Sequence, residues 1–183
     1  MITFSKTKSD IELSEILQLQ KINLPQSLTE IEKKEQGFVT VSHSLENLQK
    51  MSVHEQSLII KEEDTIVGYI LAMTKNSKYE IPILLPMFAL FNKIQFKGKS
   101  VSEYNYLVVG QVCIGKEHRG IGLFDKGYLE YKNNFKEKYD FAITEIAIQN
   151  ERSINAHKRV GFIEIHRYSD ENNIEWSVVV WDW

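Results

Sequence analysis

The stretch VCIGKEHRGIGLFDKGYLEYKNNF, residues 112–135, decides the fold, because it joins an apolar run to a periodic segment through a glycine-containing turn. Glycine is costly inside a helix, so the pair Gly120 and Gly122 at an expected helix start calls for a local reason. Apolar residues then recur three and four positions apart, in a stripe made of Ile121, Phe124, Tyr128, Tyr131 and Phe135. This spacing predicts an amphipathic helix that packs against a sheet.

A strand, a glycine turn and a helix in this order form a potential anion site. The first four N–H groups of a helix have no internal partner, and the helix dipole adds partial positive charge there. Such a helix start is well suited to phosphate, and bare glycines let a ligand approach the main chain. Arg119 adds a cation with bidentate capacity. On this stretch alone, a plain turn that needs glycine for its geometry explains the pattern equally well.

Two nucleotide-binding motifs are excluded by their spacing. The dinucleotide fingerprint G-x-G-x-x-G begins well at Gly120 and Gly122, but Asp125 stands at its third glycine. A P-loop ending in the tripeptide Gly98–Ser100 would need a glycine where Lys93 stands. Neither motif is therefore present.

Bulk composition indicates one ordinary globular domain spanning residues 1–183, with 43% hydrophobic and 26% charged residues. The net charge of −3 supplies no basic field, so we expect no nucleic-acid partner. The single cysteine, Cys113, excludes an internal disulfide, and no histidine has ligand spacing, so no metal is expected. The start, MITFSKTKSD, lacks the apolar core of a signal peptide, and the longest apolar run, IPILLPMFALF, is about half a membrane span. We expect a cytoplasmic protein without a membrane partner.

Helical and extended patterns alternate along the chain without an internal repeat or a linker. Ser27 is the expected N-cap of the second helix, Glu30 completes its capping box, and Gly37 ends it. Ser44 and Asn150 are the expected N-caps of the helix that begins at 44 and of the helix at 151–160. The expected elements are an edge strand at 2–7, helices at 10–22, 28–36 and 44–51, a hairpin at 57–73, an apolar helix near 83–93, strands at 104–114 (bulged at Gly110) and 141–148, a helix at 151–160, and a hairpin at 162–168 and 174–183. This order predicts a mixed α/β (α+β) fold with one central sheet.

The second informative stretch is QNERSINAHKRVGF, residues 149–162. Taken with HRGIG at 118–122, it closely resembles the GNAT superfamily of N-acetyltransferases. In that family, motif A reads [Q/R]-x-x-G-x-[G/A], and motif B looks like N-x-x-[A/S]-x-x-x-[Y/H]-x-x-x-G-F. Phe124 departs from the small residue that usually ends motif A. The resemblance is specific over residues 105–165 and weaker elsewhere.

The resemblance implies a mostly antiparallel central sheet with splayed central strands, flanked by helices. It also implies acetyl-CoA as cosubstrate. The cofactor-binding residues carried over from the two motifs are Val112, Cys113, Ile114, Arg119, Gly120, Ile121, Gly122, Leu123, Asn150, Ser153 and Asn155. Arg152 could also contact the cofactor, although a solvated arginine explains it as well.

Acetyl transfer to an amine requires that the ammonium lose a proton and that the departing thiolate gain one. Glu145 is the candidate base, because it is an acid inside the apolar strand FAITEIAI, at a place where many relatives read L-E-V. Glu103 is the second candidate. His157 stands where many relatives carry the tyrosine that protonates the thiolate, and histidine can donate a proton at neutral pH.

The sequence thus favours an acetyl-CoA-dependent N-acetyltransferase that acts by direct attack in a ternary complex. The alternative is a non-catalytic acyl-CoA-binding or sensing protein on the same fold. A small-molecule amine and a protein or peptide amine fit equally well as acceptor. We expect the acceptor site in the N-terminal helices, the segment GFVTVSH at 37–43 and the insertion at 76–103. The insertion itself is a lid or wall of the acceptor pocket, ordinary core or a homodimer contact.

Overall fold

The computed structural model describes residues 1–79 and 81–183, so part of the predicted insertion, residue 80, lies outside the described residues. The strands are β1 Ile2–Lys6, β2 Leu58–Glu62, β3 Thr65–Met73, β4 Gln95–Phe96, β5 Lys99–Ser100, β6 Leu107–Ile114, β7 Ala142–Ala147, β8 Ile163–Ser169 and β9 Glu175–Trp181. The α-helices are α1 Asp10–Lys21, α2 Glu30–Gln36, α3 Leu45–His54, α4 Leu85–Phe91, α5 Leu123–Phe135 and α6 Glu151–Val160. The helices and the strands of the central sheet that the sequence predicts are confirmed in kind and order. The short strands β4 and β5, inside the insertion, were not predicted.

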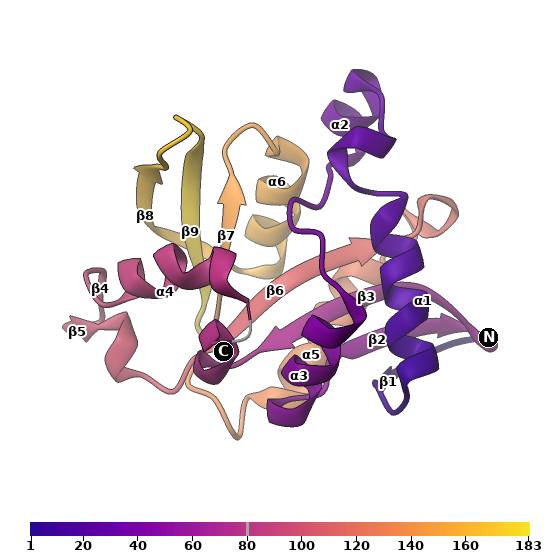
Figure 1. Cartoon of the computed structure of the whole chain (residues 1–183), viewed down its shortest axis with the longest axis horizontal. Coiled ribbons are helices and arrows are strands. Elements are labelled where there is room, and N and C mark those ends of the chain that lie inside the picture. Colours follow the sequence, from indigo (N-terminus) through magenta and orange to yellow (C-terminus); the bar gives the residue numbers. More distant parts are fainter. Residues whose placement is uncertain (80) are drawn as a thin grey trace.

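Seven strands form the central sheet in the order β1-β2-β3-β6-β7-β9-β8, and β4 and β5 form a separate small hairpin. Every neighbouring pair in the central sheet is antiparallel except β6 and β7, which are parallel. Helices α1, α3 and α4 lie on one face, which we call the front, while α5 and α6 lie behind the sheet (Figure 1). The predicted mixed, mostly antiparallel sheet flanked by helices is therefore confirmed.

Each face of the sheet carries its own apolar core. On the front, one buried cluster contains Ile16 of α1, Met51 of α3, Phe91 of α4 and Ile143 of β7. Behind it, the α5 stripe packs onto the strands, with its residues Tyr128, Tyr131 and Phe135 fully buried. The prediction that Ile121 belongs to this stripe is wrong, because Ile121 precedes the helix and is 59% exposed.

The N-terminal caps follow local chemistry, with one correction. Thr29, and not Ser27, caps α2, and its reciprocal partner is Glu32. Ser27 lies in a short turn, where its hydroxyl donates to the Lys21 carbonyl at 2.8 Å. Gly37 ends α2, and Ser44 and Asn150 cap α3 and α6, as predicted.

The centre of the sheet is opened by a bulge and by strand divergence. Ile70 pairs with Val112 while Ala72 pairs with Val109, so Gly110 and Gln111 together face one residue of β3 and form the predicted bulge. Beside it, β6 pairs with β7 only at Leu107–Ala142 and Val108–Ile143. The two strands then diverge (Figure 1), which confirms the splayed centre. None of the described helices has both the length and the apolar composition needed to cross a membrane.

Candidate active site

Two cavities meet where β6 and β7 diverge. The larger, about 390 Å³, lies between the end of β6, the start of α5 and α6, and reaches the N-terminal helices through Asn23 and Gln36. The smaller, about 60 Å³, occupies the gap between the strands. Phe38, Val39, Val112 and Ser153 line both. We call them the cleft and the gap cavity.

The glycine turn forms one wall of the cleft. Gly120 and Gly122 have φ angles of 78° and 81°, which explains why side-chain-bearing residues are disfavoured there. A Cβ added to either would meet nothing within 4 Å, so open space lies beside the main chain. Among the described residues, no side chain caps the start of α5 or of the short helix α4, whereas α1, α2, α3 and α6 each have a side-chain cap. The start of α5 is therefore left to bind an anion through its N–H groups.

Arg119 lies in this wall but is held by the protein itself. Its Nε donates to the Ile114 carbonyl at 2.9 Å, and its Nη atoms donate to Asn23 at 2.5 Å and to Gln36 at 3.2 Å. The guanidinium thus ties the end of β6 to α1 and α2. Its positive charge still faces the cleft, where Arg152 is a further cationic lining residue.

Phe124, the departure from the small residue expected in motif A, points into the core as the sequence predicts. Its ring lies 4.9 Å from the ring of Tyr128 and 5.3 Å from that of His157, between centroids. Phe124 also lines the cleft. Because the ring is held by aromatic neighbours, it leaves the glycines free.

Glu145 lies on the front side of the gap cavity. The Tyr168 hydroxyl, from β8, donates to its Oε2 at 3.0 Å, while its Oε1 is buried without a partner. Burial raises the pKa of this carboxyl to about 7, and the bond from Tyr168 opposes the shift only in part. Glu145 is therefore a carboxyl that changes charge near neutral pH, with one oxygen free to take a proton.

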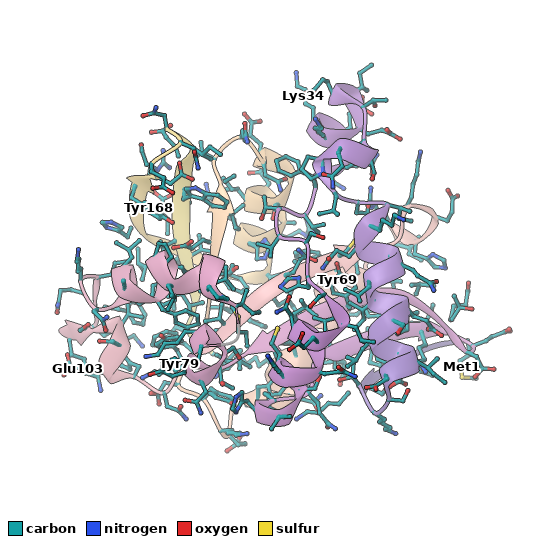
Figure 2. All side chains as sticks on the ribbon, in the orientation of Figure 1. Met1, Lys34, Tyr69, Tyr79, Glu103 and Tyr168 are labelled. Atoms are coloured by element: carbon teal, nitrogen blue, oxygen red, sulfur yellow. The ribbon has the colours of Figure 1, made fainter. Side chains whose placement is uncertain are left out.

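Glu103, the second candidate base, lies elsewhere. It is exposed, lines neither cavity, and its Oε2 accepts from the Ser100 N–H at 2.8 Å. Figure 2 shows Glu103 near the β4–β5 hairpin, well apart from Tyr168. The reciprocal cap that it forms with Ser100 explains its presence.

His157 lines the gap cavity from α6 and is fully engaged there. The Ser153 carbonyl can only accept, so the contact of 2.8 Å places the ring proton on Nδ1, and Nε2 then accepts from the Tyr128 hydroxyl at 2.7 Å. Burial lowers the pKa of His157 to about 4. The ring is thus neutral at pH 7, which argues against the expected role as acid for the thiolate.

Comparison with known proteins reaches only the level of the fold. No family model and no curated protein sequence matches the chain. Among solved structures, a GNAT-family protein from Desulfovibrio desulfuricans superposes with a TM-score of 0.66 at 9% identity, covering 100% of this chain and 99% of that one. The chain has the GNAT fold.

Two other structures with this fold were solved with ligands. NAA60 of Arabidopsis thaliana, in complex with acetyl-CoA, has a TM-score of 0.63 at 13% identity and is covered fully in both chains. A chain of the NatC complex bound to Gag peptide and CoA has a TM-score of 0.65 at 13% identity, with 100% of this chain and 98% of that chain covered. The GNAT fold therefore extends over the whole chain, although sequence identity is too low to carry activity with it.

The structure brings most of the predicted cofactor residues of this GNAT fold to one place. Val112, Cys113, Ile114, Arg119, Gly120, Gly122, Leu123 and Ser153 line the cleft. Asn150 lines the gap cavity instead, where its Nδ2 donates to the Phe38 carbonyl at 2.9 Å. Ile121 and Asn155 line neither cavity.

Residues 37–40, after α2, line the cleft or the gap cavity, and they belong to the segment 37–43 that the sequence predicts at the acceptor site. Sequence reasoning missed two side chains far from the motifs, Gln111 and Trp176, which line the gap cavity. The bulge at Gly110 was the one available signal, since a bulge turns the next side chain out of the ladder. The described residues contain no cluster of three or more His, Cys, Asp or Glu side chains that could hold a metal.

Proposed function

We propose that this chain is an N-acetyltransferase that moves the acetyl group of acetyl-CoA to a primary amine by direct attack in a ternary complex. One observation carries the proposal: Glu145, which lines a gap that joins the uncapped start of α5, has a buried carboxylate oxygen without a hydrogen-bond partner. The GNAT fold of the chain, and the acetyl-CoA bound to the NAA60 protein with that fold, support it.

The cleft fits a cofactor that carries phosphates and a long flexible arm. The uncapped N–H groups at the start of α5, with Gly120 and Gly122, would hold the pyrophosphate. Residues 112–114 of β6 border the cleft on the side that β7 has left, so their main chain would bind the pantetheine arm. Ser153 would contact the arm from α6, and Asn150 would hold the wall of the gap. Bound acetyl-CoA would supply an activated acetyl group and a thiolate leaving group, which would take its proton from solvent water.

Glu145 would act as the general base. An alkyl ammonium has a pKa near ~10, so a base with a pKa of about 7 is charged often enough at neutral pH to take the proton. Oε1 would receive the proton, because Oε2 already accepts from Tyr168. Tyr168 thereby fixes the orientation of the carboxylate.

His157 takes a supporting role in this proposal. A neutral ring with both nitrogens in hydrogen bonds is a poor acid. The same two hydrogen bonds hold the His157 ring in place and join Tyr128 of α5 to Ser153 of α6. We propose that it keeps the back wall of the gap in place.

Cys113 supports direct attack over a covalent route. Its thiol lies in the cleft wall, where burial raises its pKa to about 12, so it stays protonated and is a weak nucleophile. A buried free thiol also fits the reducing cytoplasm, where we propose that the protein resides. The acceptor would be a small-molecule amine or a peptide amine, as the Gag peptide bound to the NatC complex suggests.

A non-catalytic acyl-CoA sensor is the competing function, and the neutral state of His157 favours it. Calorimetric titration with acetyl-CoA tests the shared premise, and an acetyl-transfer screen over amines and peptides separates the two. Transfer that Glu145→Gln abolishes supports the enzyme. Binding without transfer to any amine supports the sensor, and no binding at millimolar acetyl-CoA excludes both.

A further inference from the structure

Residues 37–43, which we call the strap, connect α2 to α3 and carry no strand pairing. Figure 1 shows this segment descending in front of β6 from α2 to α3. Phe38 and Val39 line both cavities, and Thr40 lines only the gap cavity. The strap therefore forms a wall of both the cleft and the gap cavity that Glu145 lines.

The strap is held by single hydrogen bonds to its main chain from four separate places. The Val39 N–H donates to the Asn23 carbonyl at 3.1 Å, and the His43 N–H donates to Gln20 Oε1 at 2.8 Å. The carbonyls of the strap accept from Asn150 Nδ2 at Phe38, at 2.9 Å, and from Gln111 Nε2 at Val41, at 2.8 Å. Without sheet pairing, the position of the strap depends on these few side chains.

Hydrogen-bonding logic fixes the orientation of both glutamine amides. The His43 N–H can only donate, so the oxygen of Gln20 must face it, and the Gln20 nitrogen then faces Gln111 Oε1 at 2.8 Å. The Val41 carbonyl can only accept, so the Gln111 nitrogen must face the strap. Both requirements agree, and neither amide can turn over without placing like groups against each other.

The same logic sets the rest of the cluster. The second hydrogen of the Gln20 nitrogen faces His43 Nδ1 at 2.9 Å, so that ring nitrogen accepts. Tyr69, whose place in the middle of the sheet is labelled in Figure 2, donates its hydroxyl to Gln111 Oε1 at 2.6 Å. Burial lowers the pKa of His43 to about 4, so the cluster keeps this pattern at neutral pH.

Gln111 is the one member of this cluster that also belongs to the bulged edge of β6 and lines the gap cavity. We propose that Gln111 is a positioning residue, which clamps the strap to β6 and so shapes the acceptor side of the gap. This rests on the proposed function, because only an acceptor amine makes that side of the gap a substrate site. Gln111 then sets the KM for the amine, and it leaves the cofactor site and the chemistry unchanged.

The test uses two variants that release the strap and one that does not. Gln111→Met keeps a side chain of similar length but loses the bond to Val41, and Gln20→Met loses its bonds to the His43 N–H and to His43 Nδ1. Both variants also lose the bond between the two glutamines. Tyr69→Phe removes only a donor to Gln111 and leaves both strap bonds in place.

In both methionine variants we expect the amine KM to rise about tenfold, since a released strap that weakens amine binding by ~1.4 kcal/mol gives a factor of ten. We expect kcat and the acetyl-CoA Kd to stay within about twofold of wild type, because Phe38 and Val39, the strap residues that line the cleft, keep their bonds with Asn150 and Asn23. Tyr69→Phe should retain the wild-type KM.

Amide hydrogen exchange gives a readout that needs no acetylation. The His43 N–H should exchange about tenfold faster in both methionine variants and at the wild-type rate in Tyr69→Phe. If wild type acetylates no amine, the proposed function fails while exchange still decides whether Gln111 clamps the strap. Wild-type exchange at His43 in Gln111→Met, or a KM effect equal in Tyr69→Phe, overturns the proposal. If Gln111→Met does not fold, Gln20→Met carries the same comparison.

Discussion

The cleft and the gap cavity meet between β6 and β7, yet they are built in different ways. The anion site in the wall of the cleft is formed by main chain, at the end of one strand and the uncapped start of the next helix, within residues 112–125. The gap cavity is lined by residues from separate parts of the chain, among them Gln111, Glu145 and Trp176. A main-chain site tolerates sequence change as long as the glycines remain, whereas a side-chain site depends on every contact. The two should therefore respond differently to substitution.

The largest effect is expected for Glu145→Gln, which leaves the shape of the gap intact and removes the base. We predict that kcat falls by roughly 10²–10⁴, the usual contribution of general acid–base catalysis. The acetyl-CoA Kd should stay within about twofold, because Glu145 does not line the cleft. Steady-state kinetics and calorimetry measure the two quantities. Turnover within threefold of wild type would remove Glu145 from the mechanism.

Gly122→Ala should show the opposite pattern, with cofactor binding as the main loss. The added methyl group stands in the open space beside the start of α5, so we expect the acetyl-CoA Kd to rise at least about tenfold. Gly98→Ala is the matched control, because Gly98 has a similar φ of 86°, an equally open Cβ position and no place in either cavity.

Both alanines should cost about 1 kcal/mol of stability through the same backbone strain. Chemical denaturation checks that the two losses agree. Equal acetyl-CoA affinity in the two variants would show that the turn is merely geometric.

A third prediction concerns the pH dependence of stability, to which the buried carboxyl of Glu145 in the gap cavity should contribute. The folded pKa of Glu145, about 7, lies above its ordinary value of 4.5, so wild-type stability is lost as pH rises from 4.5 through 7. Glu145→Gln avoids that loss, and we expect it to be more stable than wild type by about 1–3 kcal/mol at pH 8, since one pKa unit is 1.36 kcal/mol. At pH 4.5 the two proteins should match. Urea denaturation at both pH values measures the difference, and a variant less stable at pH 8 would contradict the buried charge.

The smallest catalytic effect is expected for His157→Phe. A positioning role predicts that turnover falls more than acetyl-CoA affinity does, but by less than the ~10² typical of a lost general acid. A fall as large as that of Glu145→Gln would restore the acid role. The histidine also adds an acid-side prediction, because its folded pKa of about 4 lies below its ordinary 6.5. Its stabilisation is complete above pH 6.5 and is lost as pH falls toward 4, so His157→Phe should flatten that limb of the thermal unfolding profile.

The elements that local chemistry specifies were predicted well. Asn150 as a cap and the α5 stripe from Phe124 to Phe135 each depend on residues within a few turns of helix. The errors were also local in kind. Ser27 and Thr29 are both capable N-caps two residues apart, and the choice fell to Thr29, whose partner Glu32 stands three residues on.

The sequence by itself determined the glycine turn, the order of strands and helices, and an acid inside an apolar strand, because each is written in neighbouring residues. Only the tertiary structure decided what those residues can do. It buried His157 between Tyr128 and Ser153, left one oxygen of Glu145 free, and brought the strap from residues 37–43 against Gln111. Burial and hydrogen bonding between residues far apart in the chain set protonation and position, and no local pattern records them.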